Sequence, residues 1–231
     1  DIFVKYGFIP SPLSIYKNVF KLGPSTILEV DESLKVSKYN YYDLKEQLFD
    51  KSKNNRNVKE TKDTIDDVNK LLKSKIKNML SKDFKVGCFL SGGIDSALVT
   101  SIAQSMSKKK IETYTLKTSS KNFDESDNAK KISKYLGTNH NTYKVKKKDI
   151  ISYVNNMHNY YSEPFGDSSQ IPCFLLSKYA KKKIKILLTG DGGDEISGGY
   201  NRYLYFKRYY NAFTRNIFVK TLLKLCISVI Y

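Results

Sequence analysis

Short apolar runs alternate with amphipathic stretches along most of the chain after residue 60. Helical spacing is clear between residues 65 and 79, where Ile65, Val68, Leu72 and Ile76 recur every three or four positions. Strands are then predicted at 84–90, 111–116, 141–145 and 184–188, with helices at 97–107, 124–136, 149–160 and 168–182. Alternating strands and helices are typical of a parallel sheet with helices on both faces. The pattern therefore predicts an α/β fold.

The start of the chain has a different character. Three of the five prolines lie within the first 24 residues, and the extended run 26–30 indicates a strand. This part resembles the edge of a β-rich unit more than a complete domain. A polar, aperiodic stretch follows and indicates a linker. The predicted organisation is a β-rich remnant at 1–50, a linker at 51–60 and an α/β domain at 61–231.

The first loop of interest, residues 91–96, reads Ser-Gly-Gly-Ile-Asp-Ser between an apolar run and a helical pattern. At such a helix N-terminus we expect backbone N–H groups without partners, next to the positive end of the helix dipole. The two glycines let a phosphate approach closely, and the two serines offer hydroxyl donors. Asp95 would repel a phosphate unless a cation lies between them, which favours bound Mg²⁺. The alternative is an ordinary strand-to-helix turn with a serine cap.

The second loop, residues 189–200, reads Thr-Gly-Asp-Gly-Gly-Asp-Glu-Ile-Ser-Gly-Gly-Tyr and follows the apolar run 184–188. Its carboxylates, Asp191, Asp194 and Glu195, would repel one another unless they share a cation. If the two preceding strands are neighbours, Asp95 and Asp194 face one space. That arrangement predicts a site for Mg²⁺ on a triphosphate. The alternative is a solvated acidic turn.

Composition narrows the choices further. The chain has 231 residues and a formal net charge of +17. This surplus favours anionic partners such as nucleotides, nucleic acid or acidic lipid. It is mostly lysine, with runs such as 108–110, 146–148 and 181–183 near predicted element ends, where solvated lysines are common. The apolar stretch 217–231 is too short and too charged for a membrane span.

The three cysteines, Cys88, Cys173 and Cys226, are widely spaced and lie in apolar segments. They predict neither a disulfide framework nor a zinc site, but buried thiols in a reducing compartment. With only two histidines, metal chemistry based on histidine is not expected.

Together the two loops resemble a known family. The first loop is similar to the pyrophosphate loop (PP-loop) of the ATP pyrophosphatases, which split ATP into AMP and pyrophosphate. Its pairing with the second loop resembles the synthetase domain of glutamine-hydrolysing asparagine synthetases. Further similarities lie at 123–126 with Ala129 and Lys130, at 163–169 with Ile171 and Pro172, and at 7–12, which resembles the end of that family's amidotransferase domain. The resemblance covers nearly all of 1–205 and implies a Rossmann-like, adenine nucleotide alpha hydrolase-like fold.

The resemblance also implies roles for individual residues. Ser91, Gly92, Gly93, Asp95 and Ser96 would hold the β- and γ-phosphates of ATP, while Leu90 and Leu116 would line the adenosine pocket. Thr189 and Gly190 would lie near the ribose and α-phosphate, Asp95 and Asp194 would bind Mg²⁺, and Asp191 could orient ammonia or take its proton.

The implied reaction is the amidation of aspartate by an asparagine synthase-type ligase. The β-carboxylate attacks the α-phosphate of ATP to give β-aspartyl-AMP and pyrophosphate, and ammonia then displaces AMP. Three alternatives stay open: amidation of another carboxylate, modification of tRNA, and nucleotide binding without turnover. The net charge favours the tRNA alternative, whereas the acidic second loop and the proline-rich start argue against nucleic acid.

The chain departs from the family pattern at both ends. The family's amidotransferase uses an N-terminal cysteine, whereas this chain begins with Asp1 and its first cysteine is Cys88, inside a predicted strand. No counterpart of the family's C-terminal helices and charge-stabilising lysine is found before Tyr231. We therefore expect a fragment of a longer cytoplasmic protein that binds ATP and Mg²⁺, and expect turnover by this chain alone to be impaired. A homodimer of the full-length form is left open, and no membrane partner is expected.

Overall fold

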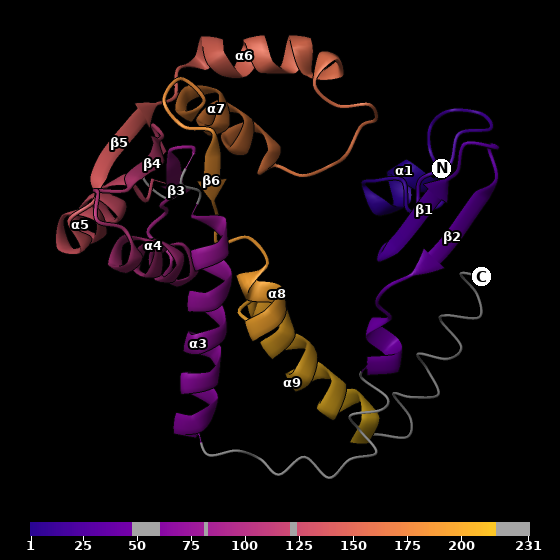
Figure 1. Ribbon diagram of the computed structural model, residues 1–231, viewed down its shortest axis with the longest axis horizontal. Coiled ribbons are helices and arrows are strands. Elements are labelled where there is room, and N and C mark those ends of the chain that lie inside the picture. The colour runs from indigo at the N-terminus through magenta and orange to yellow at the C-terminus, as the bar shows by residue number, and fades with distance from the viewer. Residues whose placement is uncertain (48–60, 81–82, 121–123, 216–231) are drawn as a thin grey trace. The chain divides into compact units, whose positions relative to one another are not determined.

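The computed structural model (Figure 1) describes residues 1–47, 61–80, 83–120 and 124–215. Its contacts divide the chain into two compact units, each of which is described by itself. The first unit comprises residues 1–75, 116–123 and 143–182, and the second comprises residues 76–115, 124–142 and 183–231.

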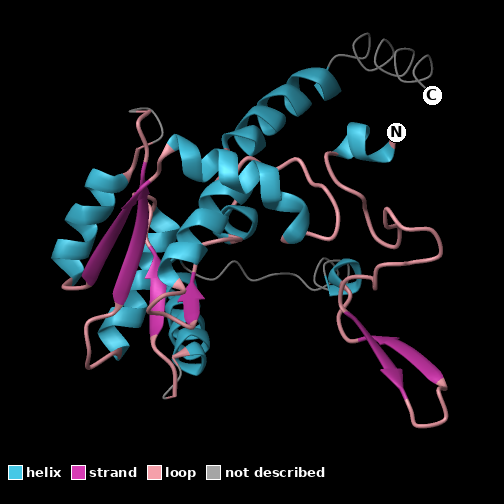
Figure 2. Ribbon diagram, turned by 90° about the horizontal axis from the view of Figure 1, so that it is seen from above, coloured by secondary structure: helices cyan, strands magenta, loops and turns pink. Residues whose placement is uncertain are grey.

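A four-stranded sheet forms the centre of the fold, and Figure 2 shows its strands side by side. The strands are β3 (Val86–Phe89), β4 (Glu112–Lys117), β5 (Asn139–Lys144) and β6 (Ile186–Leu188), in the order β5-β4-β3-β6. The central strand β3 pairs in parallel with both β4 and β6. The predicted α/β class with a parallel sheet is confirmed, and all four strands lie within three residues of their predicted bounds.

Central strand β3 is apolar throughout, as expected for a strand covered on both faces. Cys88 is fully buried and stands in register with Thr113 of β4 and Leu188 of β6. The two strands that follow β3 in the chain lie on one side of it, and β6 lies on the other. The strand order therefore reverses between β3 and β6, and ligands of open α/β sheets bind outside the carboxyl ends of the strands at such a point.

The helices of the second unit include α4 (Ile94–Met106), α5 (Ser126–Leu136), α8 (Gly193–Ser197) and α9 (Asn201–Arg215). Helix α4 packs against both β3 and α5, as Figure 1 shows. Helix α5 ends at Gly137, the C-cap, whose φ of 72° is the left-handed conformation that favours glycine.

The tyrosine-rich sequence of helix α9 has its rings at helical spacing, which favours an amphipathic helix that packs onto the sheet. The helix is present, but Tyr203, Tyr205 and Phe206 are all exposed. The periodicity of these rings predicted the helix correctly, but periodicity alone does not determine which surface covers them.

The first unit contains α1 (Ile2–Tyr6), an antiparallel hairpin of β1 (Thr26–Val30) and β2 (Val36–Asn40), α6 (Lys147–Asn156), the 3₁₀ helix η2 (Met157–Asn159) and α7 (Gln170–Ala180). Helix α3 (Thr61–Met79) belongs partly to each unit. The hairpin confirms that a small β element precedes the α/β fold. Helices α6 and α7 pack against each other.

An N-terminal segment, residues 7–22, contacts a loop more than 140 positions further along the chain. The Lys21 ammonium forms an ion pair with the Glu163 carboxylate. The Tyr16 hydroxyl donates to the Ser162 carbonyl at 3.0 Å. The backbone N–H of Gly166 donates to the carbonyl of Gly7 at 2.5 Å. These contacts fix residues 7–22 against the loop 162–166 within the first unit.

Two cysteines test the expectation of buried thiols. Cys88 is buried, as predicted, whereas Cys173 is exposed. Cys173 lies in the first turn of α7, before Leu175 and Leu176, which begin the buried side of that helix. Cys226 lies outside the described residues. Among the described helices, none combines the length and apolar character that a bilayer crossing requires.

Candidate functional site

A cleft of about 750 Å³ opens at the carboxyl ends of β3 and β6, where the strand order reverses. Both loops singled out in the sequence contribute to it. Its lining residues are Phe89, Ser91, Gly93, Ile94, Asp95, Ser96, Thr189, Gly190, Asp191, Asp194, Ser197 and Gly199. Eight of the predicted site residues are among them. The condition set in the sequence analysis, that the two preceding strands are neighbours, is met, and both loops line this cleft.

Contacts at two glycines show how tightly the two loops approach. A Cβ atom at Gly190 would lie 2.7 Å from the backbone nitrogen of Ser96 and 3.0 Å from the Cβ of Asp95. A Cβ atom at Gly193 would lie 2.5 Å from the carboxylate of Asp95. Side chains at these positions would separate the loops. Their glycines thus permit the close approach that places Asp95 beside the second loop.

The carboxylate of Asp194 lies against the backbone of the same loop. Asp194 stands in the first turn of α8, and a Cβ atom at Gly199 would overlap its Oδ1. The backbone N–H of Gly199 also donates to the carbonyl oxygen of Asp194, at 3.0 Å. Asp95 and Asp194 both line the cleft, and Gly193, which precedes Asp194, lies close to the Asp95 side chain.

Hydrogen bonds within the first loop correct another expectation. The N–H groups of its turn were expected to lack partners. The N–H of Ser91 donates to the Ser96 hydroxyl at 3.2 Å, and that of Gly93 donates to the Ser91 hydroxyl at 3.1 Å. The hydroxyls fold back onto the loop because they are within reach of its own backbone. The N–H of Gly92 donates to a carboxylate oxygen of Glu125 at 3.0 Å.

Unpaired donors begin one residue further on. No described residue accepts a hydrogen bond from the backbone N–H groups of Ile94, Asp95 or Ser96. These groups form the first turn of the 13-residue helix α4, where intrahelical acceptors do not exist. The positive end of the α4 dipole therefore faces the cleft with free donors.

Next to Asp194, the second loop is held by a small polar cluster. The Tyr200 hydroxyl donates to the Glu195 carboxylate at 2.7 Å, and the Arg202 guanidinium lies 4.0 Å from the centre of the Tyr200 ring. The Tyr200 hydrogen bond lowers the pKa of the Glu195 carboxyl, and the charge of Arg202 lowers it further. The same hydrogen bond raises the pKa of Tyr200. Glu195 is thus stabilised as an anion by its own neighbours.

Some predicted residues lie outside the cleft lining. Leu90 is only 1% exposed, and its N–H donates to the Tyr114 carbonyl at 2.9 Å. Leu116 lies on β4 and does not line the cleft, and neither does Gly92. Sequence reasoning missed the lining residues Phe89, Ile94, Ser197 and Gly199, which flank the predicted ones, and it also missed the role of Glu125 at the first loop.

The side chains of the cleft determine whether it could hold a metal ion. Among the described residues, no group of three or more histidine, cysteine, aspartate or glutamate side chains is arranged to hold a metal. The cleft instead offers carboxylates from two strand ends, Asp95 and Asp194. Mg²⁺ is commonly held by one or two carboxylates together with substrate phosphates and waters. These residues fit a Mg²⁺ ion that arrives with a phosphate.

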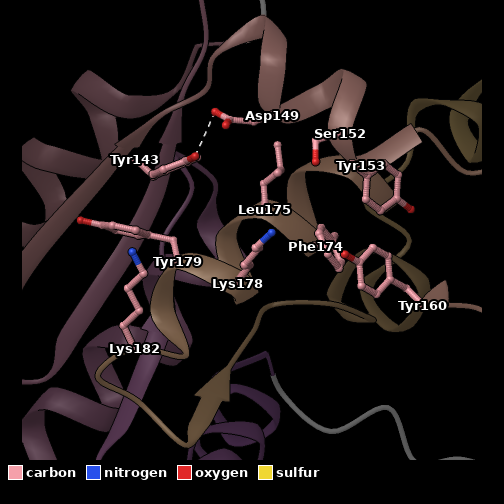
Figure 3. Close-up of a pocket in the computed structure, with 10 residues that line it drawn as sticks. All are labelled: Tyr143, Asp149, Ser152, Tyr153, Tyr160, Phe174, Leu175, Lys178, Tyr179 and Lys182. Atoms are coloured by element: carbon pink, nitrogen blue, oxygen red, sulfur yellow. Dashed lines mark hydrogen bonds between the residues drawn. The ribbon is translucent and has the colours of Figure 1, made fainter. Parts of the chain in front are cut away.

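A second cavity, of about 150 Å³, lies in the first unit between α6 and α7 (Figure 3). None of the predicted site residues lines it. Within it, Tyr143 donates to Asp149 at 2.9 Å, and the Lys178 ammonium lies over the Phe174 ring. Burial and the Asp149 hydrogen bond raise the pKa of Tyr143. This cavity is a packing feature of the helix pair.

Comparison with known proteins bears on the class of this site. The asparagine synthase family matches residues 67–223. The chain is 35% identical over 208 residues to a putative glutamine-hydrolysing asparagine synthetase of Methanocaldococcus jannaschii, covering 88% of this chain and 38% of that protein. It is 27% identical over 202 residues to a glutamine-hydrolysing asparagine synthetase of Bacillus subtilis, covering 87% of this chain and 30% of that protein.

Among solved structures, the NMN synthetase of Francisella tularensis aligns with a TM-score of 0.41 at 18% identity, over 58% of this chain and 60% of that one. The family match extends over both loops of the cleft and over more than half of the chain. The chain belongs to the asparagine synthase family. It spans 38% and 30% of the two curated relatives described above.

Proposed function

We propose that the cleft binds ATP with Mg²⁺ and that the chain is the part of an asparagine synthase-type ligase that activates a carboxylate. The observation that carries the proposal is the meeting of two loops at neighbouring strand ends, with Asp95 and Asp194 lining one cleft. One loop supplies backbone and hydroxyl donors, and the other supplies acidic groups. This division matches what a metal-bound triphosphate requires. Membership of the asparagine synthase family supports the same chemistry.

In the proposed mechanism, the first loop holds the departing pyrophosphate. The unpaired N–H groups of Ile94, Asp95 and Ser96 donate to the β- and γ-phosphate oxygens, and the α4 dipole stabilises their negative charge. The serine hydroxyls at 91 and 96 add donors that can turn from the loop toward a phosphate. Because these donors are fixed before the reaction, they stabilise the charge that develops on the leaving group.

The second loop orients the reacting end of ATP. Thr189, Gly190 and Asp191 line the cleft. Thr189 and Gly190 would lie beside the ribose and α-phosphate, and Asp191 would orient ammonia or accept its proton near the carboxylate to be activated. Asp95 and Asp194 would hold Mg²⁺, which would neutralise charge on the phosphates. The substrate β-carboxylate of aspartate attacks the α-phosphate, pyrophosphate leaves, and ammonia then displaces AMP from β-aspartyl-AMP.

Nucleotide binding tests the site first. In titration calorimetry with ATP and Mg²⁺, Asp95→Ala and Asp194→Ala are each expected to weaken affinity at least about tenfold, because hydrogen bonds and contacts to charged groups contribute about 1.5–3 kcal/mol. Asp66→Ala removes an exposed carboxylate from α3 and should leave binding unchanged. Equal affinity in the wild type and both cleft variants would show that the site is assigned wrongly.

Turnover tests the reaction. The chain is mixed with ATP, Mg²⁺, ammonia and aspartate, and released pyrophosphate and AMP are measured. Formation of asparagine that requires aspartate supports the proposed acceptor. Pyrophosphate release with another carboxylic acid, and none with aspartate, would assign a different acceptor to the same chemistry. Because turnover by this chain alone is expected to be impaired, ATP binding without any product would leave the nucleotide site standing and would assign no acceptor.

A further inference from the structure

One backbone N–H group of the first loop already donates a hydrogen bond to a carboxylate from another element. Glu125 immediately precedes α5, and its Oε2 accepts a hydrogen bond from the Gly92 N–H at 3.0 Å. The start of α5 packs directly on the loop, since a Cβ atom at Gly92 would lie 3.0 Å from the Cβ of Asn128 and 3.3 Å from that of Glu125. The backbone that carries the Glu125 carboxylate is therefore packed against the loop.

The neighbouring donors of this loop are held differently. The N–H groups of Ser91 and Gly93 donate to serine hydroxyls of the loop itself, which are neutral. Glu125 alone brings a full negative charge to one of these three amides. A carboxylate oxygen and a phosphate oxygen make the same charge-assisted hydrogen bond to a backbone N–H. Gly92 lies between the cleft-lining residues Ser91 and Gly93, so Glu125 occupies a donor of the loop that is proposed to hold the phosphates.

We propose that Glu125 determines the specificity of this loop for phosphate that carries a divalent cation. The inference rests on the proposed function, because it concerns the same loop and substrate. A phosphate oxygen that binds the Gly92 amide must displace the Glu125 carboxylate. Glu125 is exposed and can turn away, but it stays within a few ångströms of the incoming anion. Like charges at that distance repel, and a cation between them removes the repulsion.

Glu125 should therefore affect the binding of metal-free pyrophosphate and of Mg²⁺-bound pyrophosphate differently. Metal-free pyrophosphate meets Glu125 as well as Asp95, and both repel it. Pyrophosphate with Mg²⁺ carries less negative charge and meets both carboxylates through the cation. Glu125 therefore weakens the binding of the metal-free form more than that of the metal-bound form. The loop discriminates through a side chain that belongs to neither of the two strand ends.

Titration calorimetry of the full 231-residue chain with inorganic pyrophosphate tests this inference. The titrations are run once with excess EDTA and once with Mg²⁺. Glu125→Gln keeps the size of the side chain and an acceptor oxygen but removes the charge. We expect it to tighten metal-free binding roughly three- to tenfold, the range given by exposed charge pairs and charge-assisted hydrogen bonds. Binding with Mg²⁺ should change by less than about twofold on the same scale.

Two further variants separate charge from contact. Asp127→Asn removes a carboxylate from the first turn of the same helix α5 and should leave the ratio of the two affinities at its wild-type value. Glu125→Asp keeps the charge but shortens the side chain by one methylene. Because the repulsion persists, we expect its metal dependence to remain close to that of the wild type. Far-UV circular dichroism verifies that each variant is folded.

The outcomes distinguish the two proposals. Suppose that the wild type binds pyrophosphate with Mg²⁺ and that Glu125→Gln has the same ratio of metal-bound to metal-free affinity. The role of Glu125 is then overturned, and the proposed function stands. An equal shift in Asp127→Asn also overturns it, since any charge at that helix end would then suffice. Absence of pyrophosphate and ATP binding in every folded chain overturns the proposed function and this inference with it.

Discussion

At the scale of single residues, two cysteines of one chain differ in reactivity because their surroundings differ. Burial raises the pKa of the Cys88 thiol to about 11. Cys173 is exposed. Because the thiolate is the reactive form, we expect iodoacetamide at pH 8 to alkylate Cys173 at least about tenfold faster than Cys88. Peptide mass spectrometry at successive times measures both rates.

Denaturant provides the control for this prediction. In guanidinium chloride the environment of Cys88 is lost, so both cysteines should react at similar rates. Equal alkylation rates of the two cysteines in the native chain would mean that Cys88 on β3 is not buried. The exposed Cys173 was not expected from sequence, because an apolar neighbourhood in the chain, here Ile171 to Leu176, does not determine which side of a helix is covered.

The candidate site was predictable in its residues more than in its contacts. Glycines and carboxylates at two strand ends predict a phosphate and cation site, and Asp95 and Asp194 do line one cleft. Their roles stay predictions. The bond between Glu125 and Gly92 joins residues 33 positions apart and depends on side-chain torsions and on how α5 approaches the loop. Neither follows from residue types, so this contact could not be read from the sequence.

At the scale of elements, the approach of the two loops depends on small residues. A Cβ atom at Gly190 would meet the backbone of α4 at Ser96, which cannot move as a flexible side chain would. We expect Gly190→Ala to destabilise the fold by about 1–3 kcal/mol, the usual cost of overpacking. Chemical denaturation followed by circular dichroism measures this change. Weaker ATP binding should accompany it, because the loops that line the cleft are pushed apart.

A second glycine serves as the matched comparison. A Cβ atom at Gly23 would meet only the side-chain oxygen of Thr26, at 3.3 Å, so that a shift of a few tenths of an ångström relieves the contact. Gly23→Ala should therefore change the free energy of unfolding by less than about 0.5 kcal/mol, as most surface substitutions do. If Gly190→Ala were equally mild, the close packing of the second loop on α4 would be wrong.

Element prediction succeeded where periodicity was strong and failed where it was weak. The buried strands β3 and β6 and the amphipathic helices α3 and α5 carry clear patterns, because one side of each must be covered. Strand β2 was not predicted: its residues, Val36–Asn40, are all exposed, so no alternation marks them. The five-residue helix α1 is too short for a helical period to be visible.

At the scale of the whole molecule, the order of the strands carries the functional argument. Sequence alone predicts that strands alternate with helices, but not which strands become neighbours. The site requires β3 and β6 to lie side by side although nearly 100 residues separate them. Right-handed connections limit the choices without fixing this one. The pairing of Cys88 with Leu188 is therefore the structural fact that turned two separate motifs into one cleft.

Long-range contacts also hold the beginning of the chain. Lys21 forms a partly buried ion pair with Glu163 and donates to the carbonyl of Ile9 at 2.5 Å. Replacing Lys21 with methionine keeps most of the unbranched side chain but removes the ammonium group and with it both contacts. We expect the N-terminal segment, residues 7–22, to open more often in this variant. Partly exposed ion pairs contribute up to about 1 kcal/mol, which corresponds to roughly fivefold more opening.

Chymotrypsin measures this opening because its sites Tyr16 and Phe20 lie inside the segment and are not changed by the substitution. Cleavage at these sites, followed by mass spectrometry, should be about two- to fivefold faster in Lys21→Met than in the wild type, since proteolysis follows the open population when closing is fast. Lys17→Met removes an exposed charge from the same segment and should leave the rate unchanged. Equal rates in both variants would mean that the Tyr16 and Gly7 contacts hold the segment without Lys21. Faster cleavage in Lys21→Met alone would identify this ion pair as the contact that keeps the first residues of the chain on the loop 162–166.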